Sequence, residues 1–335
     1  MSQKCDDDGV PNYISELINQ IAQREGFTNY SISHSVGSNK GDGFLGEILR
    51  FQINGDLNNI SSTLSLICKL PPADIARRID SNTDITFGRE ILMYDYVLPF
   101  LIEFQRECGV SEVDGFYSFP KCYGTILDDK PNGDHAIVLE DLLVRDCYLW
   151  DKLQKIDYDR ARLVMIEMGK LHAVSFAIRD KNPDKLNEIR KKTSDTHHKA
   201  MYMQPLAILF LNSNIRKAVN TLEPHEKDLI AKLEALRGNN CFEVIEQVFS
   251  NTTPEPFGVI VHGDLWNNNI MYENDDKGAP SKSIFIDWQM SQFGSPTLDV
   301  AHYIFCSLDE DTRSKYYHEF IDCYYNSLTQ TLKKF

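Results

Sequence analysis

The chain has 335 residues, of which 42% are apolar and 25% are charged, and this is the composition of an ordinary globular protein. Its length suffices for about two domains, or for one large domain with two lobes, and argues against wholesale disorder. Lys and Arg number 35 against 49 Asp and Glu, and the formal net charge of −14 disfavours binding to nucleic acid or to an anionic membrane surface.

The N-terminal half alternates strand-like and helix-like segments. Residues 12–25 place their isoleucines and Leu17 on one helical face, and residues 87–108 show a second apolar helical face that Pro99 should kink or split. We predict strands over 31–36, 46–53, 62–70, 119–127 and 135–142, with a hairpin turn over 54–59. These elements indicate a small antiparallel sheet that carries one inserted helical segment.

The chain becomes mostly helical after Leu142. We predict helices over 158–179, around 200–220, over 224–250 and from Asp299 onward, and two short strands within 258–273 and 281–289. The change in character gives an α+β fold class with two lobes, one over residues 1–141 and one over 142–335. A cleft between the lobes is the expected place for a ligand.

Other sequence features indicate the cellular setting. No window approaches the roughly 20 apolar residues of a membrane helix, and the acidic N-terminus lacks an export signal. The eight cysteines show no CxxC spacing, which favours free thiols over a disulfide framework or a zinc site. We therefore expect a cytoplasmic protein without a membrane partner, and the sequence does not indicate its oligomeric state.

The strongest candidate site consists of two polar segments, 262–269 and 286–288. The first has the pattern HxDxxxxN, which puts the carboxylate of Asp264 and the amide of Asn269 on one loop, and Asp287 ends the next strand. Phosphoryl transfer needs a carboxylate that orients the acceptor hydroxyl, and hard oxygen ligands that hold Mg²⁺ against the phosphates. We therefore expect Asp264 as catalytic base and Asn269 and Asp287 as metal ligands, the alternative being a polar turn before a hairpin.

A phosphate anchor is expected in the N-terminal lobe. Lys69 lies near the end of an apolar strand, and Glu90 follows it 21 residues later on the next helix. A buried lysine that faces ATP phosphates gains from a carboxylate that fixes its long side chain. The alternatives are an edge-strand lysine and a glutamate on a solvated helix face.

A glycine-rich segment precedes the second strand. Gly41, Gly43 and Gly46 match the pattern GxGxxG, which is shared with dinucleotide-binding folds. A dinucleotide fold needs a helix directly after the glycines, whereas the residues that follow have the character of a strand. We expect a flap over the triphosphate, with a simple hairpin turn as the alternative.

Supporting roles are expected for four further residues. The backbone at Glu140 and Leu142 ends the last strand of the first lobe and is a candidate to hydrogen-bond an adenine edge. Asp299 either caps the helix that begins near it or accepts hydrogen bonds from the backbone of the catalytic loop. His262, the first residue of the HxD pattern, is expected to give structural support.

Taken together, these segments resemble the ecdysteroid kinase-like family, also called CHK or choline kinase-like, within the aminoglycoside phosphotransferase relatives of protein kinases. The specific parts are the tryptophan after HGDL and the run from DWQ to GSPTLD, and 87–99, 138–142 and 171–177 also match. The resemblance covers about residues 12–330. It implies a bilobal protein kinase-like fold, ATP and Mg²⁺ as cofactors, and phosphorylation of a small-molecule alcohol.

The resemblance also assigns roles by position. It places the catalytic base on Asp264, the metal ligands on Asn269 and Asp287, and the phosphate-binding lysine on Lys69, with Glu90 as its partner. Members of the family usually continue for several more helices, so we expect a naturally short enzyme or a truncated isoform with an open acceptor pocket. Trp288 replaces a common phenylalanine, and we expect this to change packing and not chemistry.

The acceptor alcohol is less well indicated than the reaction. The family name suggests an ecdysteroid, or another apolar alcohol, bound among the helices of 150–250. Residues that would line such a pocket, or else belong to ordinary core, are Met201, Tyr202, Met203, Leu209 and Phe210.

Two other functions remain open from the sequence. One is a catalytically silent kinase fold that binds a ligand or partner. The other is a metal phosphohydrolase that would use His262, Asp264, Asp287 and His302.

Overall fold

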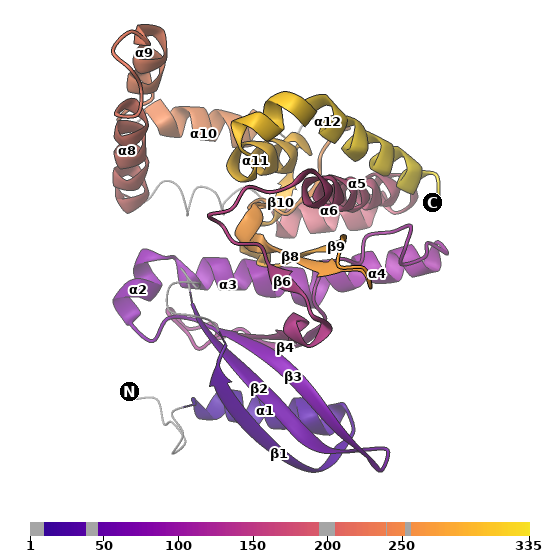
Figure 1. Ribbon diagram of the computed structural model, residues 1–335. Coiled ribbons are helices and arrows are strands. Elements are labelled where there is room, and N and C mark those ends of the chain that lie inside the picture. Colours follow the sequence, from indigo (N-terminus) through magenta and orange to yellow (C-terminus); the bar gives the residue numbers. More distant parts are fainter. Residues whose placement is uncertain (1–9, 38–45, 194–204, 239, 252–255) are drawn as a thin grey trace.

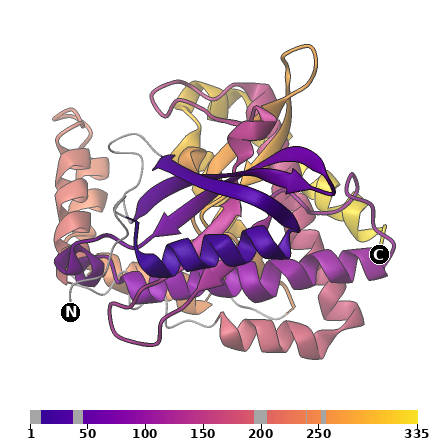
Figure 2. The same cartoon turned by 90° about the horizontal axis from the view of Figure 1, so that it is seen from below.

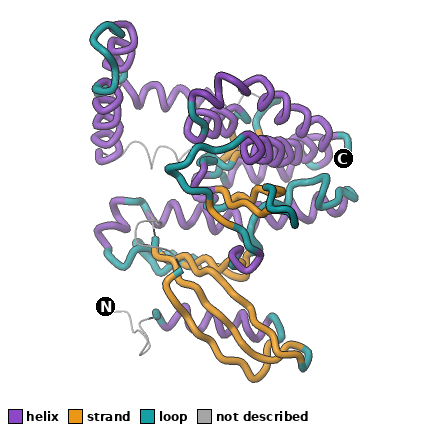
Figure 3. The backbone as a smooth tube through the Cα atoms, viewed as in Figure 1, coloured by secondary structure: helices purple, strands orange, loops and turns teal. Residues whose placement is uncertain are grey.

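The computed structural model describes residues 10–37, 46–193, 205–238, 240–251 and 256–335. Strands gather in the N-terminal lobe and helices dominate the C-terminal lobe (Figures 1 and 3). The expected α+β fold class, with a small antiparallel sheet followed by a mainly helical lobe, is confirmed. Among the described helices, none combines the length and the apolar character that crossing a bilayer requires.

The N-terminal lobe is built on a five-stranded sheet in the order β1-β2-β3-β5-β4, with every neighbouring pair antiparallel. The strands are β1 (Phe27–Val36), β2 (Glu47–Leu57), β3 (Ile60–Leu70), β4 (Cys122–Ile126) and β5 (Ala136–Glu140). The predicted turn over 54–59 was too long, because β2 continues to Leu57. Asn58 and Asn59 make the turn with φ of 52° and 62°, a conformation that suits a two-residue hairpin.

The alternation of side chains along β3 determines where Lys69 points. Leu66 and Cys68 are fully buried against helix α1 (Asn12–Arg24), which crosses this face of the sheet (Figure 2). Successive side chains of a strand point to opposite faces, so Lys69 projects from the other face, toward the C-terminal lobe. A period-2 pattern thus places one cation on the inner surface of the sheet.

A long helical segment lies between the sheet and the C-terminal lobe (Figure 1). After α2 (Ile75–Asp80), it comprises α3 (Thr83–Leu92), a π-helical turn η1 (Met93–Val97) and α4 (Leu98–Glu107). The predicted disturbance at Pro99 takes the form of this π-helical turn, and Pro99 lies in the first turn of α4. In a regular helix the ring of Pro99 would clash with the carbonyl of the residue four positions before it, and the wider turn directly before α4 relieves this clash.

The C-terminal lobe is centred on α5 (Tyr158–Lys181), which has buried residues on all sides and packs along α12 (Glu310–Leu332). The other helices are η2 (Leu142–Arg145), α6 (Pro183–Lys192), α8 (Pro205–Val219), α9 (Lys227–Ala235), α10 (Asn240–Asn251) and α11 (Thr297–Ser307). Helices α8 and α9 stand away from the body in Figure 1. Leu209 and Phe210 on α8 are 66% and 65% exposed, so they are not core residues, and 201–203 lie outside the described residues.

Short strands carry the loops of the candidate site. Strand β7 (Val259–Val261) pairs with β10 (Gln292–Gly294), and β6 (Tyr148–Leu149), β8 (Ile270–Asn274) and β9 (Pro280–Phe285) form a second small sheet. The short 3₁₀ turns η3 (Asn267–Asn269) and η4 (Trp288–Met290) lie beside these strands. Ile270 is opposite Phe285 in the β8–β9 hairpin, and this register brings Asn269 next to Ile286.

The close contact of α5 with α12 generates a stability prediction. A Cβ at Gly169 would lie 2.6 Å from the backbone oxygen of Tyr324, whereas a Cβ at Gly88 in α3 would have no neighbour within 4 Å. Gly169→Ala should lower the free energy of unfolding by about 1–3 kcal/mol through overpacking. Gly88→Ala should raise it by about 0.5–1 kcal/mol through helix propensity. Urea unfolding measures both, and equal effects of the two substitutions would contradict the packing argument.

Candidate active site

Two polar loops meet at the ends of β7 and β9. The N–H of Ile286 donates to the carbonyl oxygen of Asn269 at 3.0 Å, and His262 Nε2 donates to the carbonyl oxygen of Ile286 at 3.0 Å. Asp287 follows directly and has φ of 67°, a left-handed conformation that is uncommon for a residue with a side chain. The hydrogen bonds between the loops therefore hold Asp287 beside the 262–269 loop, in a backbone conformation that a free chain would seldom adopt.

Asp264 is oriented by its own loop. Asn269 Nδ2 donates to Asp264 Oδ2 at 2.9 Å and to the Asp264 carbonyl at 2.8 Å, and the Trp266 indole N–H also donates to the carboxylate. Burial, and secondly the charge of Asp287, raise the pKa of Asp264 to about 7. The charge of Asp287 acts on Asp264 because hydrogen bonds between the two loops hold Asp287 beside the 262–269 loop.

Lys69 connects the two lobes. Its Nζ lies 2.6 Å from Glu90 Oε2 on α3 and 2.7 Å from Asp287 Oδ1. Burial opposes the charged form of Lys69, but the two carboxylates outweigh it and raise the pKa of the ammonium. The predicted Lys69–Glu90 pair is present, and neither residue is an edge lysine or a solvated helical glutamate: their side chains are 15% and 1% exposed.

Asp299 holds the start of the 262–269 loop. Its two carboxylate oxygens accept hydrogen bonds from the backbone N–H groups of His262 and Gly263, at 2.7 and 2.8 Å. It is not a helix cap, because α11 begins at Thr297. Burial raises the pKa of Asp299, but the hydrogen bond from His172 and the bonds to the loop outweigh this and lower it. Of the two roles open from the sequence, the geometry matches loop support.

Gly263 and His262 complete this support. Gly263 has φ of 84°, and a Cβ there would overlap the carbonyl of Met290, so the chain can pass only with glycine. His262 is fully buried, and its Nδ1 accepts the N–H of Asp264 at 3.3 Å. Both ring nitrogens of His262 are thus engaged by backbone groups, which leaves neither for a metal and disfavours the phosphohydrolase alternative.

The end of β5 is anchored by a residue that the sequence did not single out. Asp141 is buried, and its carboxylate accepts hydrogen bonds from Arg50 Nε and Ser65 Oγ, both at 2.8 Å, and from the N–H of Leu143 at 3.2 Å. Its carboxylate holds the backbone after Glu140 against β2 and β3. Glu140 and Asp141 are adjacent acidic residues, and nothing in the sequence indicates which of the two carboxylates is buried.

The neighbouring residues show which backbone groups are already used. The N–H of Glu140 donates to the carbonyl of Lys121 at 2.8 Å, and the carbonyl of Leu142 accepts from Cys147 N–H at 3.2 Å. The Glu140 side chain accepts from Arg145 Nη1 at 3.2 Å. These bonds occupy the Glu140 N–H and the Leu142 carbonyl.

The glycine-rich segment joins the antiparallel strands β1 and β2, an arrangement that fits a flap or a simple hairpin turn and not a dinucleotide fold. Gly41 and Gly43 lie outside the described residues. Gly46 packs against the end of β3, where a Cβ would come within 2.5 Å of the Leu70 carbonyl oxygen. Its role visible in the structure is close backbone packing at the base of the segment.

The donor set at the loops suits Mg²⁺ bound together with phosphates. Asn269 uses its amide N–H groups toward Asp264, so its Oδ1 is the atom left for a cation, and Asp287 Oδ1 already holds the Lys69 ammonium. Hard oxygen ligands of this kind, few in number, are typical of sites where phosphates supply the rest. Among the described residues, no cluster of three or more His, Cys, Asp and Glu side chains is arranged for a metal.

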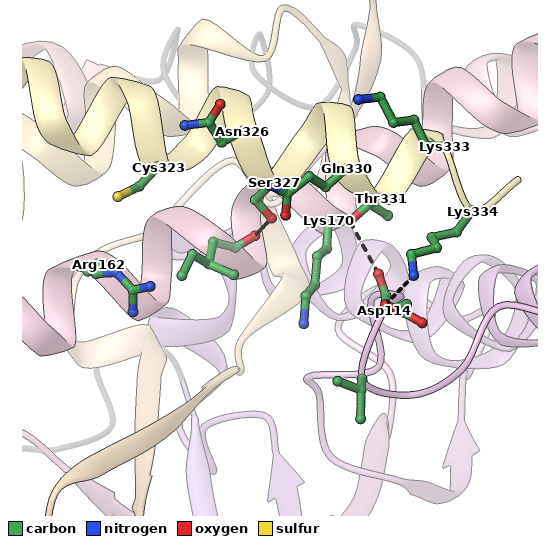
Figure 4. A pocket seen from close by; sticks show the side chains of 12 residues that line it. Asp114, Arg162, Lys170, Cys323, Asn326, Ser327, Gln330, Thr331, Lys333 and Lys334 are labelled. Carbon is green, nitrogen blue, oxygen red and sulfur yellow. Dashed lines mark hydrogen bonds and ion pairs between the residues drawn. The ribbon is translucent and has the colours of Figure 1, made fainter.

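A separate cavity of about 700 Å³ opens between α5, α12 and the loop after α4 (Figure 4). It is lined by polar and basic side chains, and two of its lysines are neutralised locally. Lys334 pairs with Asp114 at 3.0 Å, and Lys170 pairs with Glu167 at 2.7 Å. None of the predicted site residues lines it, so it is distinct from the candidate active site.

Comparison with known proteins supplies the family. The model of the ecdysteroid kinase-like family matches residues 40–335, so the chain belongs to this family, and the resemblance inferred from the sequence is confirmed. Among solved structures, an ethanolamine kinase from Plasmodium vivax is similar, with 13% identity over 98% of this chain and 79% of that chain and a TM-score of 0.46. No curated protein matches the chain.

The buried contacts of Asp299 generate a prediction about acid stability. A carboxyl whose folded pKa is below its unfolded value of about 3.9 contributes stability above that pH and loses it as the pH falls. Asp299→Asn should therefore destabilise the protein by about 2–3 kcal/mol at pH 7, and the difference from the unaltered chain should shrink below pH ~4. Urea unfolding at pH 7 and at acidic pH measures this difference, with Asp322→Asn, at an exposed residue, as the control. A difference in the free energy of unfolding that stayed constant with pH would contradict the prediction.

Proposed function

We propose that this member of the ecdysteroid kinase-like family transfers the γ-phosphoryl group of ATP, with Mg²⁺, to a hydroxyl group of a small alcohol. The observation that carries the proposal is the contact of Lys69 with both Glu90 and Asp287, at 2.6 and 2.7 Å, beside the Asp264–Asn269 pair. This arrangement provides a cation for phosphates, oxygen ligands for a metal and a carboxylate for the acceptor. Phosphoryl transfer relies mainly on such positioning and on charge.

ATP would bind along the inner edge of the N-terminal sheet. The Glu140 carbonyl and the Leu142 N–H are proposed as contacts of the adenine edge, beside buried Leu139, which lies on the inner face of the sheet, whereas Val138 packs on the α1 side. Lys69, which projects from the inner face of β3, would contact the phosphates. The segment with Gly41, Gly43 and Gly46 would cover them as a flap.

The metal would be held by Asn269 Oδ1 and the Asp287 carboxylate. When bound, Mg²⁺ screens the charge of the phosphates and fixes their orientation. Glu90 keeps the Lys69 ammonium in place from the opposite side, because it remains bound to Nζ. The left-handed conformation of Asp287 directs its carboxylate into this site without rearrangement of the loop.

Asp264 would orient the acceptor. The hydroxyl oxygen attacks the γ-phosphorus, the bond from that phosphorus to the β–γ bridging oxygen breaks, and ADP leaves with the electron pair. The hydroxyl proton passes to the Asp264 carboxylate. A carboxyl whose pKa is raised to about 7 is well matched to accept this proton near neutral pH.

The acceptor class is proposed from the family. An ecdysteroid, or another apolar alcohol, is the first candidate. The complete set of charged contacts around Lys69 favours a phosphotransferase over a silent ligand-binding protein, because holding one buried and two partly buried charges together is costly and serves the binding of phosphates. A screen with steroid, choline-like and xenobiotic alcohols, analysed by mass spectrometry for products heavier by one phosphate, would identify the acceptor.

Asp264→Asn tests the base. We expect transfer to slow by about 10²–10⁴-fold, because an amide cannot take the hydroxyl proton, while ATP affinity stays largely unchanged. The matched control is Asp276→Asn, which changes an exposed aspartate in the turn between β8 and β9. Turnover of Asp264→Asn at the rate of the control would show that the role assignment is wrong.

Asp287→Ala tests the metal ligand. We expect Mg²⁺-dependent turnover to be abolished, because the substitution removes the carboxylate and also one partner of Lys69. Titration with Mg²⁺ at fixed ATP should find no concentration that restores activity. Recovery of the full rate at higher Mg²⁺ would contradict a direct role for this carboxylate.

A further inference from the structure

We infer that His302 is a positioning residue that contacts the acceptor molecule and holds its hydroxyl group against Asp264. The inference rests on the proposed function, because it concerns the acceptor side of the same phosphotransfer. From the sequence, His302 is a candidate only in a metal phosphohydrolase. That function is disfavoured because both ring nitrogens of His262 are bound to backbone groups. A different role for this side chain is therefore open.

His302 is placed by helix α11. It lies one turn after Asp299, the residue that binds the start of the 262–269 loop, and its ring lies beside the backbone of Gly263. Its Nε2 lies 3.8 Å from Asp264 Oδ1. The same short helix thus braces the loop and directs an imidazole toward the carboxylate of the proposed base.

The distance between the two side chains suits a third group. At 3.8 Å, Nε2 and Oδ1 are too far apart for a hydrogen bond with each other, which needs about 2.7–3.2 Å. One oxygen atom can nevertheless lie about 2.8 Å from both of them. Asn269 occupies the other carboxylate oxygen of Asp264, so the oxygen that remains for an acceptor is the one that His302 faces.

The pair is open to the surroundings. The side chains of His302 and Asp264 are 30% and 29% exposed, unlike the fully buried His262 and Asp299 of the same loop system. Cys306 lies one turn further along α11 and is exposed. Burial, and secondly the charge of Asp264, raise the pKa of its thiol, so Cys306 also lies near Asp264. A molecule that approaches Asp264 along α11 would therefore meet His302.

A simple ion pair between His302 and Asp264 is a weaker explanation. Burial lowers the pKa of the imidazole, so the ring is mostly uncharged at neutral pH. An uncharged ring next to a carboxylate, without a direct hydrogen bond, is not a stabilising contact in itself. The geometry is explained when the Nε2–H of His302 donates to a hydroxyl oxygen that lies between the two groups, and the proton of that hydroxyl faces Asp264.

The test compares His302→Leu, which removes hydrogen bonding at similar size, with His302→Gln, which keeps it. Exposed His225→Leu is the control. Two reactions are measured with Mg²⁺-ATP: transfer to the best alcohol from the screen, and slow hydrolysis, in which water is the acceptor. The KM for ATP, binding of a fluorescent ATP analogue and thermal unfolding are measured for every variant.

For His302→Leu we expect kcat/KM for the acceptor to fall about 10–100-fold, the loss of one hydrogen bond to a reacting group, with KM for ATP within about twofold. Hydrolysis should fall in the same direction, and His302→Gln should recover part of both rates. A merely structural role would instead lower ATP affinity and thermal stability together and would not distinguish Gln from Leu.

The inference is overturned if His302→Leu turns over acceptor and water at the rate of the His225→Leu control, or if Gln and Leu lose activity equally. An unaltered chain that neither binds nor turns over Mg²⁺-ATP overturns the proposed function, and the inference with it. The two failures are distinguishable, because the first leaves nucleotide binding and turnover of the unaltered chain intact.

Discussion

The arrangement of the two lobes depends on one ammonium group shared by two carboxylates. Lys69 comes from the inner face of β3, Glu90 from α3 and Asp287 from the loop after β9, and they meet within 2.7 Å of Lys69 Nζ. Trp288, next in the chain, donates its backbone N–H to Glu90 and is itself fully buried beneath α3. The same few residues therefore join the sheet, the interlobe helix and the catalytic loops.

Such a buried charge cluster is costly to build and more costly to break. Desolvation of the charges opposes their burial, and removal of one partner from a buried pair typically costs about 3–5 kcal/mol, because the remaining charge is left uncompensated. Elsewhere the loops are held by neutral backbone donors bound to Asp299. Loss of one carboxylate partner of Lys69 would thus disturb the contacts around its ammonium group, while the hydrogen bonds from the His262 and Gly263 N–H groups to Asp299 remained.

Sequence patterns predicted the parts of the fold whose period or spacing is local. The place of Lys69 near the end of an apolar strand, the place of Glu90 on the next helix and the HxDxxxxN spacing indicated which side chains would meet. The structure brings Lys69, Glu90, Asp264 and Asn269 to one region. The anchor at Asp141 was not predictable, because its partner Arg50 comes from β2, which is not a neighbour of β5 in the sheet. Contacts of this kind arise from sheet order, which no local pattern encodes.

The π-helical turn at Met93–Val97 has a consequence for the rotational phase of the interlobe helix. A π-helical turn accommodates one more residue than the α-helical turn it replaces, and each residue of an α-helix advances the side chains by about 100°. If the same residues were wound as regular α-helix, Glu90 would rotate by about 100° around the axis relative to α4, whereas deletion of one residue together with that change would leave the orientation nearly unchanged. The wide turn therefore absorbs one residue and keeps the angular register in which α3 presents the Glu90 carboxylate to Lys69.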